Sequence, residues 1–267
     1  MEINGKVIVV TGGGNGIGRE VVLELLRRGA RVAAVDLRAA ALAETAALAG
    51  AGDRLTSHEV DVSDAAAVER MANEVLAAHG TVDGLANVAG IIQKFVPFKD
   101  LDLDTMQKVV DVNLWGVVHT CRAFLPHLVQ RPEASLVNVS SMGALVPVPG
   151  QSLYGASKAA VKLLTEGLYA ELRTTSVAVT VVFPGAVSTG IADNSDAAVP
   201  GRDASNSDAA AKLTSAPDAG RMIVEAMEKG QPRLRIGSDA TMLDRLSRLA
   251  PTRAIELVAK RMAGLVS

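Results

Sequence analysis

The stretch Thr11-Gly12-Gly13-Gly14-Asn15-Gly16-Ile17-Gly18 stands between a short apolar run and a segment of helical periodicity. Its glycines at positions 12, 16 and 18 have the spacing G-x-x-x-G-x-G. Glycine lets a turn tighten and lets main-chain N–H groups approach a phosphate, while the helix that follows turns its positive dipole end toward the anion. A glycine cluster alone also fits a flexible turn. The strand before it and the helix after it favour a dinucleotide-binding turn.

Short apolar, β-branched runs alternate with longer helical patterns along the rest of the chain. Several runs are apolar at nearly every position, which is typical of parallel strands covered by helices on both faces. The alternation predicts a doubly wound, mostly parallel α/β fold of Rossmann type, forming a single domain over residues 1–267. The predicted strands are residues 6–11, 31–35, 55–60, 84–88, 136–139, 178–183 and 233–236, and the predicted helices are residues 16–28, 39–49, 64–79, 104–129, 153–173, 218–229, 239–250 and 252–263.

Residues 190–216 interrupt the alternation, because they are rich in Ala, Ser, Asp and Asn and have no clear period. Such a composition fits a solvated, partly disordered loop. Long loops in compact domains often carry function, and this one follows a strand whose end lies at the ligand-binding edge of such a sheet. We therefore expect a mobile substrate lid here.

The bulk composition argues against several classes of protein. The formal net charge is -2, which offers no electrostatic attraction for nucleic acid or an anionic membrane. No apolar run approaches the roughly 20 residues that cross a bilayer, and the first residues lack the pattern of a signal peptide. A lone cysteine, Cys121, has no partner for an internal disulfide or a thiolate metal site. We expect a cytoplasmic protein without a metal.

Asp36 ends the second predicted strand, 18 residues after Gly18. This is close to the spacing at which an acidic residue accepts hydrogen bonds from the adenosine ribose hydroxyls. A carboxylate there would repel a 2′-phosphate, which favours NAD over NADP, although the guanidinium of Arg38 could pair with that phosphate. Asp36 also suits the N-cap of the next helix, and both roles can hold together.

Tyr154 and Lys158 lie four residues apart in a predicted helix, which places them on one face. An ammonium group beside a phenol lowers the pKa of the phenol, so that it can serve as general base in alcohol oxidation or general acid in carbonyl reduction. Ser141 follows the predicted strand 136–139 and could hydrogen-bond the reacting oxygen from the same edge of the sheet. A Y-x-x-x-K pair alone is common on surface helices.

Together these features resemble the short-chain dehydrogenase/reductase family over nearly the whole chain. The family's T-G-x-x-x-G-x-G matches residues 11–18, and its Y-x-x-x-K matches residues 154–158. Its serine lies about thirteen residues before the tyrosine, which selects Ser141 rather than Ser140, and its middle-helix asparagine matches Asn113. One departure is Val88, which replaces the second asparagine of the usual N-N-A-G in residues 87–90 and would loosen a structural hydrogen bond.

The resemblance implies a role for each matching residue. Tyr154 is the general acid/base, and Lys158 lowers its pKa and holds the nicotinamide ribose. Ser141 orients the substrate oxygen, and Asn113 holds a water that links Lys158 to solvent. The residues that the resemblance places against the cofactor are Gly12, Asn15, Gly16, Ile17, Gly18, Asp36, Leu37, Asp61, Val62, Asn87, Ala89, Gly90, Tyr154, Lys158, Pro184, Gly185, Val187 and Thr189.

We therefore expect an oxidoreductase that transfers a hydride between NAD(H) and a secondary alcohol or ketone. An apolar pocket for that substrate is predicted between residues 91–95, residues 141–148 and the lid, lined by Ile91, Ile92, Phe95, Met142, Leu145, Val146 and Val148. Two alternatives are an epimerase or dehydratase of the same fold that uses the cofactor transiently, and a regulator that binds a dinucleotide without turnover. Family analogy also predicts a homo-oligomer, commonly a tetramer, with the helices that carry Asn113 and Tyr154 at a subunit interface.

Overall fold

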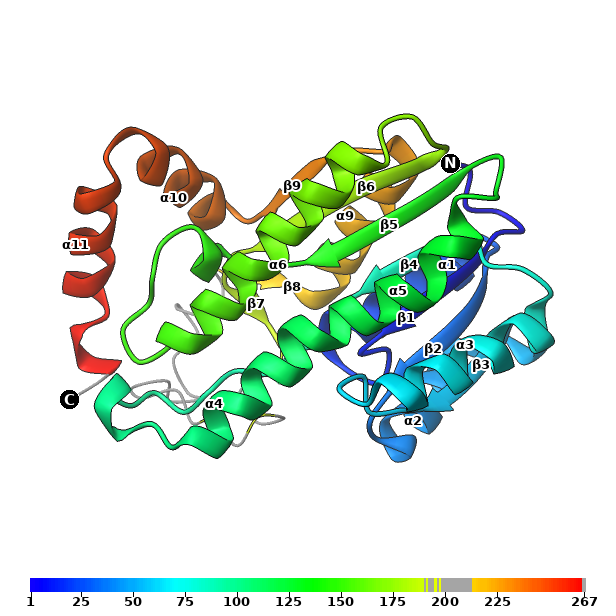
Figure 1. The fold of residues 1–267 in the computed structure, drawn as a ribbon, viewed down its shortest axis with the longest axis horizontal. Coiled ribbons are helices and arrows are strands. Elements are labelled where there is room, and N and C mark those ends of the chain that lie inside the picture. Colours follow the sequence, from blue (N-terminus) through cyan, green and yellow to red (C-terminus); the bar gives the residue numbers. More distant parts are fainter. Residues whose placement is uncertain (190, 192–194, 196, 198–212, 266–267) are drawn as a thin grey trace.

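The computed structural model describes residues 1–189, 191, 195, 197 and 213–265 (Figure 1). Among these residues the chain forms a seven-stranded sheet in the order β3-β2-β1-β4-β5-β6-β9, in which all neighbouring strands are parallel. The strands are β1 (Val7–Thr11), β2 (Arg31–Asp36), β3 (Leu55–Glu59), β4 (Gly84–Asn87), β5 (Ala134–Val139), β6 (Val177–Pro184) and β9 (Arg233–Ile236). The doubly wound parallel fold predicted from the alternation is confirmed.

Helices cover both faces of the sheet, and alternate residues of each central strand point to opposite faces. In β1, Ile8 and Val10 pack toward one layer of helices, while Val7 and Val9 pack toward the other. The first layer contains α1 (Gly16–Arg27), α2 (Ala39–Ala49) and α9 (Ala216–Lys229), and the second contains α3 (Ala65–His79), α5 (Gly116–Leu128) and α6 (Ser152–Glu171). In the described part of the chain, no helix has the length and apolar character needed to span a membrane.

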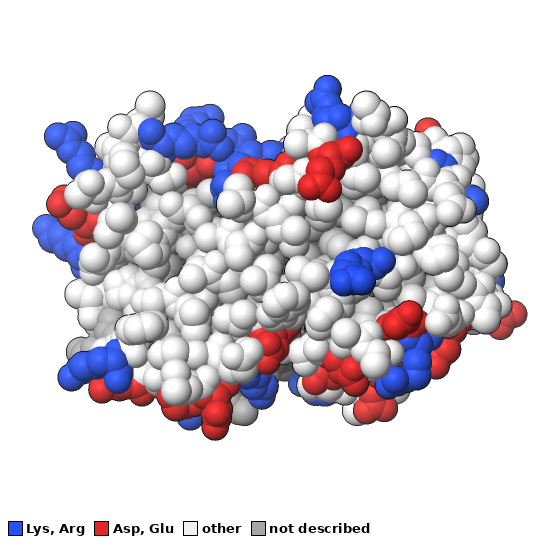
Figure 2. Space-filling view, in the orientation of Figure 1, with Lys and Arg blue, Asp and Glu red and all other residues white. Residues whose placement is uncertain are grey.

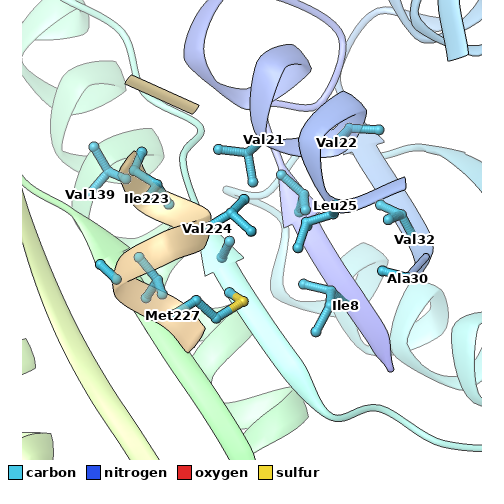
Figure 3. Close-up of a cluster of buried hydrophobic side chains, with 14 of the residues drawn as sticks. Ile8, Val21, Val22, Leu25, Ala30, Val32, Val139, Ile223, Val224 and Met227 are labelled. Carbon is cyan, nitrogen blue, oxygen red and sulfur yellow. The ribbon is translucent and has the colours of Figure 1, made fainter. Parts of the chain in front are cut away.

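The core beneath the glycine-rich turn lies between α1 and α9 (Figure 3). Val21 and Leu25 of α1 meet Ile223 and Met227 of α9 over Ile8 of β1, and all five side chains are fully buried. Burying a side chain of this size contributes about 1.5–3 kcal/mol. This packing fixes the direction of α1, and with it the direction in which the first N–H groups of α1 point.

The predicted continuous helix over residues 104–129 is interrupted in the structure. It consists of α4 (Leu103–Val110), a π-helical turn (Asp111–Trp115) and α5. A π-helical turn inserts one extra residue per turn and changes which side chains face inward, a feature often found at functional sites. The turn carries Asn113, which is fully buried. Periodicity in the sequence did not reveal it, because the flanking segments are helical on both sides.

Most of the predicted lid lies outside the described residues, namely 190, 192–194, 196 and 198–212, so its mobility stays a prediction. Its approximate predicted end, residue 216, is the first residue of α9. Thr214–Ser215 forms the short strand β8, which pairs in parallel with β7 (Val187–Ser188). Ser215 then caps α9 through a hydrogen bond from the N–H of Asp218. Two-residue strands have no periodicity that a sequence pattern could show.

The chain ends in two helices, α10 (Ser238–Leu249) and α11 (Pro251–Arg261), which lie at one end of the molecule in Figure 1. Their buried side chains Leu243, Ala254 and Val258 form a small apolar cluster with Val146. Met142, Leu145 and Val148 pack against the same cluster. The C-terminal helices therefore hold the segment that follows β5.

Candidate active site

The glycine-rich turn lies against the chain that leaves β4. Gly12 has φ +71°, and a Cβ atom there would lie 2.9 Å from the main-chain nitrogen of Ala89. The Thr11 hydroxyl accepts hydrogen bonds from the N–H groups of Val88 (3.0 Å) and Ala89 (3.2 Å). The bonds involve the main chain at residue 88, so the valine at this position keeps them. Only glycine at position 12 allows this close approach.

The first turn of α1 is held in place by side-chain hydrogen bonds. Asn15 caps the helix, and its side-chain oxygen accepts a hydrogen bond from the N–H of Gly16. Arg19 donates to the carbonyl of Gly14 through Nη2 (2.6 Å) and Nε (3.0 Å), and also to the hydroxyl of Thr45. A helix start held in this way attracts an anionic phosphate group.

Asp36 holds the same turn from β2. Its Oδ2 accepts from the N–H of Gly14 (3.0 Å), and its Oδ1 accepts from the N–H of Arg38 (3.1 Å). The prediction that Asp36 caps α2 is wrong, because the N-cap is Arg38, immediately before Ala39. The Nε of Arg38 lies 4.0 Å from Asp36 Oδ1, so the two predicted determinants of cofactor choice form a loose ion pair.

A cavity of about 610 Å³ opens at the carboxyl edge of the sheet beside this turn. Such a volume is typical of cofactor sites. Of the predicted residues, those lining it are Gly12, Asn15, Gly16, Ile17, Gly18, Asp36, Leu37, Asp61, Val62, Ala89, Gly90, Ser141, Tyr154, Lys158, Pro184, Gly185, Val187 and Thr189. Gly90 forms part of the wall, and a Cβ there would lie 3.0 Å from Lys158 Nζ. The glycine cradle, the helix start and the cavity together fit a nicotinamide dinucleotide.

One wall of the cavity was missed from the sequence. Helix α4 contributes Asp104, Gln107 and Lys108, and the π-helical turn that follows it contributes Asp111. The last three lie three, four and seven residues after Asp104, a spacing that places all four side chains on one helical face. The spacing could have shown a common polar face, but not that the face borders a cavity. The other lining residues not assigned to the cofactor are Arg38, Val60, Ser63, Val88, Ile91, Ile92, Val112, Val139, Ser140 and Ile191.

Ser141 and Tyr154 meet at the inner end of the cavity. Ser141 follows β5, where its hydroxyl accepts from the N–H of Gly143 (3.0 Å) and hydrogen-bonds the Tyr154 phenol. Tyr154 lies in the first turn of α6. Burial raises the pKa of the Tyr154 phenol, and the bond with Ser141 lowers it in part. The neighbouring Ser140 instead donates to the main-chain carbonyl of Lys158.

Lys158 is buried one turn after Tyr154, and its Nζ donates to the carbonyl of Val139 (3.1 Å). Burial lowers the pKa of Lys158 to about 8. The prediction that Lys158 lowers the pKa of Tyr154 stays a prediction, because burial holds the pKa of this phenol above its ordinary value. Burial disfavours the charged form of both groups, and here it outweighs other influences on the phenol.

Asn113 does not line the cavity but fastens its wall. Its Oδ1 accepts from the N–H of Ile91 (2.9 Å), and its Nδ2 donates to the carbonyl of Ile91 (2.9 Å) and to the hydroxyl of Ser157 (3.1 Å). The side-chain amide is thus bonded to protein groups. The predicted water link between Asn113 and Lys158 remains a prediction.

Asn87 was predicted to line the cofactor groove, but it is not among the described residues that line the cavity. Its side chain turns into the protein, where Nδ2 donates to Asn138 Oδ1 (2.9 Å) and Oδ1 accepts from Thr120 (2.8 Å). Asn87 and Asn138 are paired residues of β4 and β5. Two amides facing each other in a buried sheet satisfy one another, so this pair holds strands together beneath the site.

The Pro-Gly turn after β6 is held by a residue that the sequence did not single out. The Gly185 N–H donates to the carbonyl of Ile236 (2.8 Å), and the Ala186 N–H donates to Asp239 Oδ2 (2.7 Å). Asp239 lies in the first turn of α10 and packs directly on Gly185. Because Asp239 lies 53 residues after Ala186, no local sequence pattern predicts this contact.

The predicted apolar substrate wall is only partly correct. Ile91 and Ile92 line the cavity, and Ile191 joins them. Phe95 and the four predicted residues of the segment after β5 are not among the residues that line it. Those four, Met142, Leu145, Val146 and Val148, pack against the C-terminal helices instead. Their apolar character therefore reflects packing between segments far apart in the sequence.

Comparison with known proteins agrees with this geometry. The model of the short chain dehydrogenase family matches residues 6–200. The chain is 38% identical over 266 residues to a Mycobacterium tuberculosis protein that bears the name oxidoreductase SadH, covering 97% of this chain and 96% of that protein. It is 37% identical over 192 residues to 1-deoxy-11-beta-hydroxypentalenate dehydrogenase of Streptomyces avermitilis, covering 71% of each.

Solved structures show the same fold. A short chain dehydrogenase/reductase from Burkholderia phymatum in complex with NAD has a TM-score of 0.83 and 29% identity, over 96% of this chain and 97% of that one. A short chain dehydrogenase from Burkholderia cenocepacia J2315 in complex with NADP has a TM-score of 0.79 and 27% identity, over 98% of this chain and 99% of that one. The protein belongs to the short-chain dehydrogenase family and is an oxidoreductase.

Proposed function

We propose that this protein oxidises a secondary alcohol, or reduces the corresponding ketone, with Tyr154 as the group that moves the proton. The observation that carries this proposal is the convergence of Ser141, Tyr154 and Lys158 on the cavity beside the glycine-rich turn. A nicotinamide dinucleotide, when bound, accepts or supplies the hydride. The residues that would hold it are those of the glycine-rich turn, Asp36, Lys158 and the Pro-Gly turn.

Proton transfer is the part of the reaction that this chain's residues perform. In oxidation, the Tyr154 oxygen takes the proton of the substrate hydroxyl, and in reduction the phenol returns it to the carbonyl oxygen. The Ser141 hydroxyl, bonded to the phenol, is suited to hold the same substrate oxygen. Lys158, buried beside them with a pKa of about 8, supplies a positive charge below that pH, which favours the tyrosinate.

We propose a preference for NAD over NADP. Asp36 lines the cavity, and both of its carboxylate oxygens face main-chain N–H groups of the turn region. A 2′-phosphate placed beside this carboxylate would be repelled. The guanidinium of Arg38 could pair with a 2′-phosphate and so favour NADP. In this structure it lies 4.0 Å from the carboxylate of Asp36. Similar structures are complexed with either dinucleotide, so the argument rests on these two residues.

We propose a substrate with an apolar body. Ile91, Ile92 and Ile191 line the cavity, and they would pack against hydrocarbon rather than hydroxyl groups. The name 1-deoxy-11-beta-hydroxypentalenate dehydrogenase, carried by a relative, points to a hydroxyl on a largely hydrocarbon skeleton. A hydroxylated alicyclic or acyl compound is the class that we would test first.

We propose that the protein is a homo-oligomer, assembled through the face that bears α5 and α6. Figure 2 shows few charged side chains on this face. Trp115, Leu163 and Tyr169 are exposed on the π-helical turn and α6. Apolar groups exposed together mark protein contact sites more often than monomer surfaces. The tetramer and a cytoplasmic location stay predictions.

A substrate screen with purified protein tests the proposed activity. The assay follows NADH appearance at 340 nm with secondary alcohols of graded hydrocarbon size, and it repeats the series with Tyr154→Phe and Ser141→Ala. We expect turnover in the wild type, no measurable turnover with Tyr154→Phe, and unchanged NADH binding in both variants. Dinucleotide binding without any absorbance change would instead favour the non-catalytic regulator. Substrate conversion seen by mass spectrometry without net NADH would favour the epimerase or dehydratase.

A further inference from the structure

The first turn of α6, which carries Tyr154, is capped by a side chain from another part of the chain. The residue at its own N-cap, Gln151, makes no side-chain hydrogen bond to the helix. Gln93 Oε1 instead accepts from the N–H groups of Leu153 (3.1 Å) and Tyr154 (3.0 Å). These are the second and third helical positions, whose N–H groups have no partner within the helix and are normally taken by a capping side chain.

Two further hydrogen bonds and a close main-chain contact join the segment around Gln93 to the start of α6. Its Nε2 donates to the carbonyl of Gly150 (2.9 Å), and its own carbonyl accepts from Gln151 Nε2 (2.6 Å). Gly150 has φ +77°, and a Cβ there would lie 3.1 Å from the Cα of Phe95. Gln93 is only 1% exposed. A buried side chain with every polar atom bonded in this way is held in one position.

The loop that carries Gln93 is also bound to α6 on the far side of Tyr154. Asn113 holds Ile91 by two hydrogen bonds and bonds the hydroxyl of Ser157, three residues after Tyr154. Ile91 and its neighbour Ile92 line the cavity. The wall of the cavity and the start of α6 therefore form one hydrogen-bonded unit.

We propose that Gln93 is a positioning residue that sets the distance of the Tyr154 phenol from Ser141 and from the substrate oxygen. This inference rests on the proposed role of Tyr154. Gln93 is not among the residues that line the cavity, so it acts through the main chain of α6. Misplacing a reacting group by about 1 Å can cost about 100-fold in rate, so the loss of two bonds at this turn will lower kcat.

The test compares Gln93→Met with Thr165→Val. Methionine keeps the length of glutamine but removes the acceptor for Leu153 and Tyr154. Thr165 is buried in the same helix, where it accepts from Asn138 Nδ2 (3.0 Å), so its replacement also removes a buried hydrogen bond of α6. We expect kcat to fall about 10- to 100-fold in Gln93→Met and to stay within about twofold in Thr165→Val, with NADH affinity unchanged in both.

The pH profile separates positioning from a general loss of stability. The bond with Ser141 lowers the pKa of Tyr154, so weakening it moves the rising limb of kcat for alcohol oxidation to higher pH. We expect this movement in Gln93→Met and not in Thr165→Val. Equal kcat values and coincident pH profiles of the two variants would overturn the proposal. If Tyr154→Phe stays active, the proposed function itself fails, whatever Gln93→Met does.

Amide hydrogen exchange of the wild-type protein tests the same inference without any variant. First-turn N–H groups without a side-chain acceptor exchange quickly. We expect the amides of Leu153 and Tyr154 to be protected as strongly as those in the middle of α6. Fast exchange of both amides would overturn the proposal, even if Gln93→Met does not fold.

Discussion

The Asp36 carboxylate accepts a hydrogen bond from the main-chain N–H of Gly14, with 3.0 Å between Oδ2 and N. Asp36 therefore supports the glycine-rich turn and also presents charge to the cavity. Asparagine keeps an oxygen for the N–H of Gly14 but loses the charge and the acceptor for the N–H of Arg38, whereas alanine loses all three.

We expect Asp36→Asn to tighten NADPH binding relative to NADH by about tenfold, because it removes the charge that opposes a 2′-phosphate. Asp36→Ala should weaken the binding of both dinucleotides as the turn loosens. Fluorescence titration with NADH and NADPH measures these affinities. Asp53→Asn, an exposed site after α2, controls for net charge. A wild-type protein that binds NADPH at least as tightly as NADH would contradict the assigned role of Asp36.

Gly12 and Gly50 offer a matched test of the close approach at the glycine-rich turn. Both have positive φ, +71° and +52°, but a Cβ at Gly50 would meet nothing within 4 Å. We expect Gly50→Ala to lower the free energy of unfolding by about 1–2 kcal/mol, the cost of the left-handed conformation alone. Gly12→Ala should cost more and abolish NADH binding, because its Cβ would meet Ala89.

Urea denaturation and NADH titration of the two glycine variants provide the measurement. If Gly12→Ala binds NADH as tightly as Gly50→Ala does, the contact between the glycine-rich turn and the chain after β4 is not needed for dinucleotide binding.

Burial lowers the pKa of Lys158 from its ordinary value of 10.5 to about 8, which links this residue to stability. Between these pH values the unfolded chain holds the proton and the folded protein releases it, so the contribution of Lys158 becomes more favourable as pH rises. We therefore expect the wild type to gain stability relative to Lys158→Met as the pH rises from about 8 to about 10. The difference between their free energies of unfolding should grow by about 3 kcal/mol at most. Urea denaturation at several pH values measures the difference. A difference that is constant with pH would show that Lys158 titrates normally.

Asp239 connects α10 to the Pro-Gly turn through the N–H of Ala186. We expect Asp239→Ala to weaken NADH binding about fivefold, equivalent to about 1 kcal/mol for one hydrogen bond, because Gly185 and Val187 lose their support. Asp239→Asn retains an acceptor and should recover most of the affinity. Asp218→Ala, at the corresponding first turn of α9, is the control. If Asp239→Ala binds NADH as tightly as the wild type, the Pro-Gly turn keeps its conformation without Asp239.

Local patterns allowed much of the fold to be predicted. Apolar runs such as residues 6–11 and 178–183 identify central strands because burial on both faces requires apolar side chains at nearly every position. The turn at residues 11–18 was also predictable, because its glycines serve a backbone geometry that no other residue adopts easily. The pair Tyr154 and Lys158 follows from helical spacing alone.

Side-chain direction at strand ends and in loops was less predictable. Asn87 was expected in the groove but pairs with Asn138, since a residue at a strand end can point to either side of the sheet. Met142 and Val148 were expected at the substrate and instead pack against α10 and α11, because an apolar residue suits either place. The π-helical turn around Asn113 was missed, since an extra residue per turn leaves no mark on a helical pattern.

The sequence by itself determined the class of fold, the dinucleotide turn, and the positions of Ser141, Tyr154 and Lys158, because each depends on residues close together in the chain. The tertiary structure alone decided what surrounds them. Gln93 caps the helix of Tyr154 from 61 residues away, and Asp239 holds the Pro-Gly turn from 53 residues away. Burial alone, a property of the folded chain, decides that the pKa of Tyr154 rises while that of Lys158 falls.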